Sequence, residues 1–281
     1  MYSVGRALSL RYETPLWLDL SFFKRDPYKR NYRLNLYGIS AVTLHNGGLF
    51  QLCRAMSRAP CIFEQRVFSR VRVIFEAKGA HCDYDAKVLR EKMKPPFSFV
   101  YLFGYWQNEL YFREFAKEIR KELVISCEHH PDNIEMARSI ASVNAVCVHA
   151  RRLHGIVGGR DSQRTEGHRS LPIEYYIGAV AKICAEVSNP HFFLFADAPD
   201  WFRENLKIKY PVTYVNSNAH NGREYEDLWL MSACKHFIIA NSTFSWWGAW
   251  LSDFEEKIVI CPDGRRFEGG AAPCDGWDVL T

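Results

Sequence analysis

Basic, carboxylate and imidazole side chains follow two predicted strands in the second half of the sequence. His149, Arg151 and Arg152 come at the end of a short apolar run at residues 144–149, and Asp197 comes just after a later run. A guanidinium group can clamp a diphosphate in a bidentate manner. A carboxylate can accept paired hydrogen bonds from a base or a sugar. Together these residue types are suited to binding a nucleotide diphosphate.

Each of these residues also has a simpler interpretation when it is taken alone. Arg151 and Arg152 are typical of a surface ion pair, and His149 is typical of a histidine in a core. Asp197 precedes Pro199 by two residues, which is typical of a turn or of a helix N-cap. Because all four follow strands that we predict in one sheet, a shared site is favoured over these separate interpretations.

A second group of polar side chains lies in a turn that is predicted to open a helix. The apolar run at residues 237–240 indicates a buried strand, and the Ala/Trp/Leu pattern beyond the turn indicates a helix. The start of a helix presents free backbone N–H groups to an anion. The predicted site residues of this turn are Asn241, Ser242, Thr243, Phe244 and Ser245. An ordinary N-capped core helix is the alternative interpretation.

Strands and helices alternate through the second half of the chain, which predicts an α/β fold with a doubly wound parallel sheet. We expect strands at 144–149, 191–195, 212–215, 237–240 and 257–261, and helices at 173–187, 199–206 and 225–234. In such a sheet the residues that follow the strands gather along one edge. That edge would bring the two polar groups together, with a nucleotide diphosphate as the natural occupant.

The first half of the chain is less regular. We expect helices at 4–12 and 112–123, strands at 16–20 and 71–75, and a strand that leads into a turn at 98–107. A glycine-rich polar segment at 153–170 in the second half is expected to form a mobile loop. The chain of 281 residues is long for one core, so we predict two domains, at 1–142 and 143–281.

Composition limits the class of protein. A formal charge of +4 is too small to indicate a nucleic-acid-binding protein. The nine cysteines are odd in number and scattered, which is typical of reduced core residues in a cytosolic protein. No apolar stretch reaches 18 residues and no leader is visible, so neither a signal peptide nor a membrane anchor is expected. We predict a cytoplasmic protein, either free or peripheral at the inner face of the membrane.

Several segments together resemble a known family. The strongest is Phe237-Ile238-Ile239-Ala240-Asn241-Ser242-Thr243-Phe244-Ser245-Trp246-Trp247-Gly248-Ala249-Trp250-Leu251, preceded by the similar stretch at 227–236. Val148-His149-Ala150-Arg151-Arg152 is similar to a His-x-Arg-Arg donor motif, and Phe195-Ala196-Asp197 with Trp201 to a Phe-Ser-Asp-Asp segment. Weaker similarities lie at Gly5–Leu8, Gly104–Gln107 and 171–176. The chain therefore resembles the bacterial α-1,2-fucosyltransferases of glycosyltransferase family 11.

This resemblance implies a fold and a reaction. The fold would be GT-B, with two Rossmann-like domains facing across a cleft. The donor would be GDP-β-L-fucose and the acceptor the 2-hydroxyl of a terminal β-galactoside in a surface glycan such as an O antigen, with inversion and without a metal ion or other cofactor. Arg151 would neutralise the β-phosphate together with the helix start at 242–245. His149 and Asp197 would recognise ribose and guanine.

The sequence also departs from the family pattern. Leu153-His154-Gly155 stands where the family continues with Gly-Asp-Tyr, and Ala198 replaces a second aspartate. Met1 aligns just past the family's first strand and its Gly-Gly-x-Gly-Asn-Gln loop, so the first domain is expected to lack its initial strand. Two alternatives stay open: a transferase for another nucleotide sugar, and a nucleotide- or glycan-binding relative without catalysis.

Overall fold

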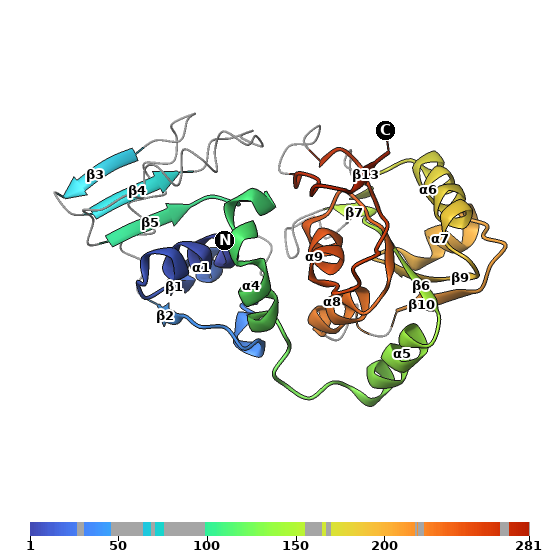
Figure 1. Ribbon diagram of the computed structural model, residues 1–281, viewed down its shortest axis with the longest axis horizontal. Helices are drawn as coiled ribbons and strands as arrows, with labels where there is room; N and C mark the ends of the chain where they lie inside the picture. The colour runs from blue at the N-terminus through green and yellow to red at the C-terminus, as the bar shows by residue number, and fades with distance from the viewer. Residues whose placement is uncertain are drawn as a thin grey trace. The chain divides into compact units, whose positions relative to one another are not determined.

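The computed structural model divides the chain into two compact units, Met1–Ser126 and Cys127–Thr281 (Figure 1). The structure describes residues 1–26, 31–45, 64–68, 71–75, 99–154, 165–166, 170–216, 218, 222–264 and 270–280. Most of the segment expected to be a mobile loop, residues 153–170, lies outside these ranges.

A parallel sheet of six strands forms the centre of the second unit. Its strands are β6 (Asn144–Ala150), β9 (Pro190–Ala196), β10 (Val212–Val215), β11 (His236–Ile238), β12 (Val259–Cys261) and β13 (Asp278–Val279). Their order is β10-β9-β6-β11-β12-β13, and every neighbouring pair is parallel. Counted along the chain this is the order 3-2-1-4-5-6 of the Rossmann fold. The predicted doubly wound sheet is therefore confirmed.

Helices cover both faces of this sheet, as the direction of the crossovers requires. They are α6 (Ile173–Glu186), α7 (Pro199–Asn205), α8 (Glu224–Ser232) and α9 (Thr243–Leu251). Figure 1 shows α6 and α7 on one side of the strands and α8 and α9 on the other. The chain changes sides between β6 and β11, which are neighbours in the sheet. Their carboxyl ends flank the topological switch point, where open α/β sheets bind their ligands.

The central strand β6 is buried on both faces, which explains its nearly continuous apolar sequence. Val146, Val148 and Ala150 belong to the apolar cluster that α6 and α7 cover. Because successive side chains of a strand alternate, Cys147 and His149 lie on the opposite face. The cysteines that the structure describes are free thiols, and Cys147, Cys234 and Cys261 are buried among them. The prediction that these three cysteines lie in the core is confirmed.

The first unit is built from short elements. They are α1 (Tyr2–Tyr12), β1 (Trp17–Asp19), η1 (Leu20–Arg25), η2 (Leu34–Leu36), β2 (Val42–Leu44), β3 (Glu64–Phe68), β4 (Val71–Phe75), β5 (Phe99–Phe103), η3 (Glu109–Tyr111), η4 (Arg113–Phe115) and α4 (Ala116–Glu122), where η marks a 3-10 helix. Strands β1 and β2 pair in parallel, and β3, β4 and β5 form a separate sheet. Within the described parts of the chain, no helix is long and apolar enough to cross a bilayer.

One predicted element of the first unit is shorter than expected. The sequence predicted a single amphipathic helix at 112–123, but the α-helix begins only at Ala116. Phe112 has φ −139° and ψ 4°, which are not helical angles, and its ring is buried. The burial of this aromatic side chain therefore overrides the helical periodicity, and the short 3-10 helix η4 takes the place of the first helical turn.

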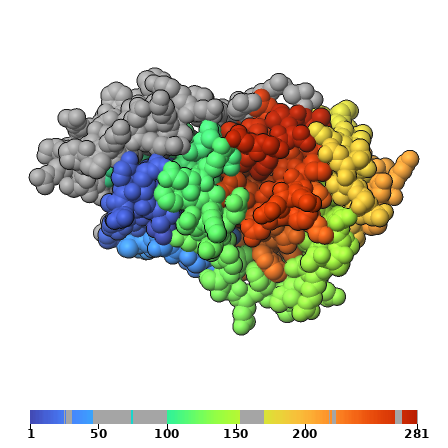
Figure 2. All heavy atoms as spheres, viewed as in Figure 1, coloured from blue at the N-terminus to red at the C-terminus, as the bar shows by residue number. Residues whose placement is uncertain are grey.

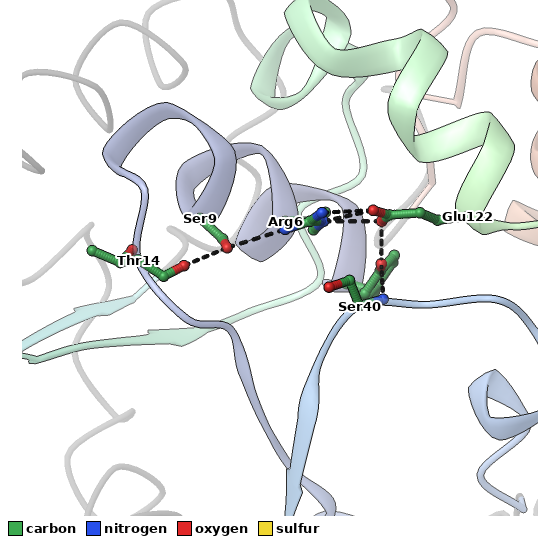
Figure 3. Close-up of polar contacts among 6 residues, drawn as sticks. Arg6, Ser9, Thr14, Ser40 and Glu122 are labelled. Atoms are coloured by element: carbon green, nitrogen blue, oxygen red, sulfur yellow. Dashed lines mark hydrogen bonds and ion pairs between the residues drawn. The ribbon is translucent and has the colours of Figure 1, made fainter.

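A partly buried ion pair joins α1 to α4 (Figure 3). Arg6 donates from Nε and Nη2 to Glu122 Oε1 at 2.9 and 2.7 Å, and Tyr2 donates its hydroxyl to Oε2 of the same carboxylate. In the space-filling view the blue segment with α1 lies beside the green segment with α4 (Figure 2). Gly5 lets α1 approach Leu16, because a Cβ there would lie 2.8 Å from Leu16 Cδ1. The family-like Gly5-Arg6 segment therefore has a packing role.

The helix α5 (Pro131–Ala141) belongs to the second unit, so the boundary between the units comes before this helix and not at residues 142–143 as the sequence indicated. This helix contacts β6 and α8. The segment leading into it is held by the buried carboxylate of Glu226, which accepts from the backbone N–H of His130 at 3.1 Å and contacts His129 Nδ1 at 3.1 Å. The ring of His129 also stacks on Trp229.

Candidate functional site

The register of β6 and β9 sets Arg151 opposite Asp197 at the carboxyl edge of the sheet. His149 pairs with Phe195 and Ala150 with Ala196, and each strand ends there. The next residues, Arg151 and Asp197, therefore continue the ladder side by side. The sequence predicted that both would lie at this edge, and the structure brings them into direct contact.

Arg151 and Asp197 form an ion pair, with Nη1 of the arginine 3.1 Å from Oδ2 of the carboxylate. The other carboxylate oxygen, Oδ1, accepts the backbone N–H of Arg152 at 2.8 Å. The arginine side chain is 42% exposed, whereas the aspartate side chain is only 11% exposed. The guanidinium group therefore contacts a partly buried carboxylate and extends toward solvent.

Arg152 is directed differently from its neighbour. Its Nη1 donates to the backbone carbonyl of Leu171 at 2.7 Å, and its guanidinium carbon lies 4.1 Å from the ring centroid of Trp201. This cation–π contact joins the end of β6 to α7. Arg152 was predicted to bind the donor together with Arg151. In the structure its guanidinium group packs on the α6 and α7 side of the sheet.

His149 lies on the opposite face of β6, beneath the first turn of α9. Its side chain is 6% exposed, and its ring centroid is 6.0 Å from that of Phe244. Burial, together with the charge of Arg151, lowers the pKa of His149 to about 3. The imidazole is therefore neutral near pH 7. Its Nδ1 is buried and makes no hydrogen bond with any residue that the structure describes.

The protonation of His149 should make the stability of the protein fall in mild acid. An unfolded histidine has a pKa of about 6.5. Between that value and the folded pKa the unfolded chain binds a proton that the folded chain does not, so stability falls as pH falls. Between about pH 7.5 and about pH 5, the wild type should lose roughly 2 kcal/mol more than His149→Gln. Urea unfolding at both pH values measures the difference, and an equal loss in the two proteins would contradict it.

The turn between β11 and α9 takes the predicted form of a strand end followed by a capped helix start. Ser242 is the N-cap, and its Oγ accepts the backbone N–H of Phe244 at 3.3 Å. Asn241, Ser242, Thr243 and Phe244 are partly exposed. Ser245 is buried instead, and its hydroxyl donates to the carbonyl of Ser242 at 3.4 Å. The backbone donors of the first turn and the side chains of residues 241–244 therefore form the accessible part of this turn.

Two tyrosines of α6 fix the carboxyl ends of three strands. The hydroxyl of Tyr175 donates to the carbonyl of Ile239 at 2.7 Å and lies 3.2 Å from that of Ile260. The hydroxyl of Tyr176 donates to the carbonyl of His149 at 3.3 Å. Burial raises the pKa of both hydroxyls, so they remain protonated donors. Sequence reasoning found these tyrosines only as a family-like pattern, because their targets are backbone groups distant in the chain.

A small cavity adjoins the turn. It lies between the segments after β11 and after β12, and Asn241, Ser242 and Gly264 are among its lining residues. Its volume is about 10 Å³, which is roughly the space of one water molecule. It is too small to hold a nucleotide. The half-exposed Arg151 side chain and the first turn of α9 are anion-binding groups that are accessible at the switch point.

Two curated proteins are similar to this chain. The chain is 28% identical over 269 residues to an alpha-1,2-colitosyltransferase of Escherichia coli, covering 93% of this chain and 86% of that protein. It is 39% identical over 121 residues to the Escherichia coli O-antigen biosynthesis glycosyltransferase WbnK, covering 43% of this chain and 39% of that protein.

A solved structure supports the fold at low sequence identity. The crystal structure of NodZ alpha-1,6-fucosyltransferase soaked with GDP-fucose matches with a TM-score of 0.50 and 14% identity, covering 97% of this chain and 94% of that chain. The α/β fold is thus of the GT-B type, as the resemblance implied. A model of Glycosyl transferase family 11 matches residues 82–266, more than half of the chain. On these grounds the chain belongs to glycosyl transferase family 11.

Proposed function

We propose that this glycosyltransferase transfers L-fucose from GDP-β-L-fucose to the 2-hydroxyl of a terminal β-galactoside, with inversion at the anomeric carbon. The observation that carries the proposal is the half-exposed Arg151 at the switch point of a Rossmann sheet, beside a strand that leads into a capped helix start. A guanidinium group and free helix N–H groups are matched to a diphosphate. The O-antigen glycosyltransferase among the relatives supports a surface glycan as the acceptor.

In this reaction Arg151 and the start of α9 would stabilise the leaving group, GDP. As the acceptor oxygen attacks C1 of fucose, the bond from C1 to the β-phosphate oxygen breaks and GDP departs with its electron pair. Negative charge grows on the diphosphate in the transition state. Arg151 and the backbone donors at the start of α9 would meet that charge without reorganising. The proton of the acceptor hydroxyl passes to a general base as the new bond to C1 forms.

The remaining residues of the site would bind the donor without reacting. His149 is neutral, so its imidazole has one nitrogen that can donate a hydrogen bond to a sugar or base and one that can accept a hydrogen bond from it. Asn241, Ser242 and Thr243 would add polar contacts along the phosphates. We leave Ser245 out of this set, because its hydroxyl is turned inward, and we assign Arg152 to holding the strand end on α7.

A transfer assay tests the proposal. Purified protein should convert GDP-fucose and a β-galactoside acceptor into an α-1,2-linked product, with GDP binding more tightly than UDP or ADP in calorimetry. Binding of GDP without turnover on any β-galactoside would favour a non-catalytic relative. Preference for UDP or ADP would indicate another nucleotide sugar and overturn the assignment of the donor.

One of the relatives supports GDP-colitose as an alternative donor. The relative that covers nearly the whole chain is described as an alpha-1,2-colitosyltransferase, and colitose is fucose without its 3-hydroxyl group. A site that hydrogen-bonds that hydroxyl would reject the colitosyl donor strongly, whereas an apolar surface there would discriminate weakly. The ratio of kcat/KM for GDP-fucose and GDP-colitose therefore decides between the two sugars.

We further propose that transfer needs no metal ion, because arginine and backbone donors would meet the charge on the departing diphosphate. Activity should therefore survive treatment with EDTA. The sequence contains one Asp-x-Asp, Asp83-Tyr84-Asp85, which lies outside the described residues. A strict requirement for manganese that returns activity after EDTA would contradict the prediction and would direct attention to that segment.

A further inference from the structure

We infer that Asp197 is a positioning residue that holds the Arg151 guanidinium toward the donor phosphates, and that it does not itself recognise guanine or ribose. This inference rests on the proposed function for the role of Arg151. It replaces the contact with the nucleotide that the sequence suggested for this carboxylate.

Both oxygens of the Asp197 carboxylate have partners within the protein. Oδ1 accepts the Arg152 N–H at 2.8 Å, and Oδ2 lies 3.1 Å from Arg151 Nη1. The first contact joins a backbone N–H to the side chain just beyond the last pair of the ladder between β6 and β9, so the carboxylate is fixed to the backbone of the segment that carries Arg151. A carboxylate fixed in this way defines where the guanidinium can lie.

The local helix start does not use this carboxylate. The N-cap of α7 is Ala198, which has no capping side chain, and Pro199 occupies the first helical turn. The interpretation of Asp197 as an N-cap is therefore not supported by the geometry. Its side chain is directed at the segment after β6 instead, where it pairs with Arg151.

Arg151 is more exposed than Asp197, as a positioning role for the carboxylate requires. Asp197 is 11% exposed and Arg151 is 42% exposed. Within the described residues, Nε and Nη2 of Arg151 make no hydrogen bond or ion pair. A guanidinium group has five donors in a rigid fork, so one edge can rest on the carboxylate while another edge faces an anion.

Electrostatics also argues against contact between this carboxylate and the donor. A diphosphate next to a bare carboxylate would be repelled, whereas a guanidinium between them screens the two negative groups from each other. The carboxylate also restrains a long side chain that would otherwise lose rotamer freedom when the phosphate binds. Asp197 would therefore strengthen phosphate binding only while Arg151 is present.

A double-mutant cycle on GDP affinity tests the inference. Asp197→Asn keeps an oxygen for the Arg152 N–H, so its melting temperature should stay close to that of the wild type. We expect this change to weaken GDP binding by about tenfold in the wild type. In the Arg151→Met background the same change should leave the affinity unchanged or raise it, because only the repulsive carboxylate is then removed. An equal loss in both backgrounds overturns the inference.

Two nucleotide analogues separate positioning from direct recognition. Inosine diphosphate lacks the 2-amino group of guanine, and 2′-deoxy-GDP lacks a ribose hydroxyl. Asp197→Asn should weaken the binding of all three nucleotides by the same factor. A selective loss for GDP would mean that the carboxylate contacts the base or the ribose. Asp200→Asn is the matched control, because Asp200 is exposed and pairs with Arg203 on α7.

This test does not depend on turnover. If the protein transfers no fucose but the cycle shows coupling in GDP affinity, the positioning role stands and the proposed reaction fails. If transfer is found and the cycle shows no coupling, the reaction stands and the positioning role is wrong.

Discussion

Arg151→Lys is expected to lower the rate of fucosyl transfer by about 10²-fold or more. Lysine keeps the positive charge but loses the planar fork that can rest on Asp197 and face the phosphates at the same time. The lysine side chain is shorter and ends in a single ammonium group. Part of the negative charge on the departing diphosphate would therefore not be stabilised. Single-turnover rates with saturating GDP-fucose measure the effect on the chemical step.

Arg203→Lys provides the control for this change. Arg203 is a half-exposed arginine on α7 that pairs with Asp200 and lies over the ring of Tyr214. The same replacement there should change transfer by less than about twofold, as for other surface substitutions. If Arg151→Lys also keeps nearly normal turnover, Arg151 does not stabilise the leaving group.

Trp250→Ala should destabilise the second unit by about 3–5 kcal/mol, as is typical when a large aromatic side chain is removed from a core. Trp250 is 2% exposed and packs against Trp246 and Trp247 within α9. The helix is held close to α8, because a Cβ on Gly248 would lie 2.9 Å from Met231 Cβ. A cavity at Trp250 would loosen the helix whose first turn faces the switch point.

Urea unfolding measures this loss, and GDP calorimetry on the folded variant measures its effect on the site. Trp247→Ala is the matched control, since Trp247 lies on the same helix but is only partly buried. The control should lose less stability than Trp250→Ala. A similar loss for the two variants would mean that the burial of Trp250 does not dominate the packing of α9.

The sequence predicted the centre of the second unit well, because its central strands β6 and β9 are seven residues long, mostly apolar and followed by clear breaks. The expected strands at 144–149, 191–195 and 212–215 are present as β6, β9 and β10. A parallel sheet buried on both faces requires continuous apolar runs, and such runs are readable without knowledge of their partners. The first unit was less readable. Its strands are short, and at Phe112 a buried ring interrupts a helix that periodicity alone would extend.

The sequence by itself determined which residues follow the strands, and hence that His149, Arg151, Asp197 and the turn at 241–245 share one edge of the sheet. It could not determine the partner of each side chain. Only the tertiary structure decided that Arg151 rests on Asp197 while Arg152 turns to Trp201. The physical reason is that the carboxyl ends of parallel strands lie at one edge of the sheet, so the order of elements in the chain is enough to place the residues that follow the strands. The direction of each side chain depends on the strand register and on the packing of the helices.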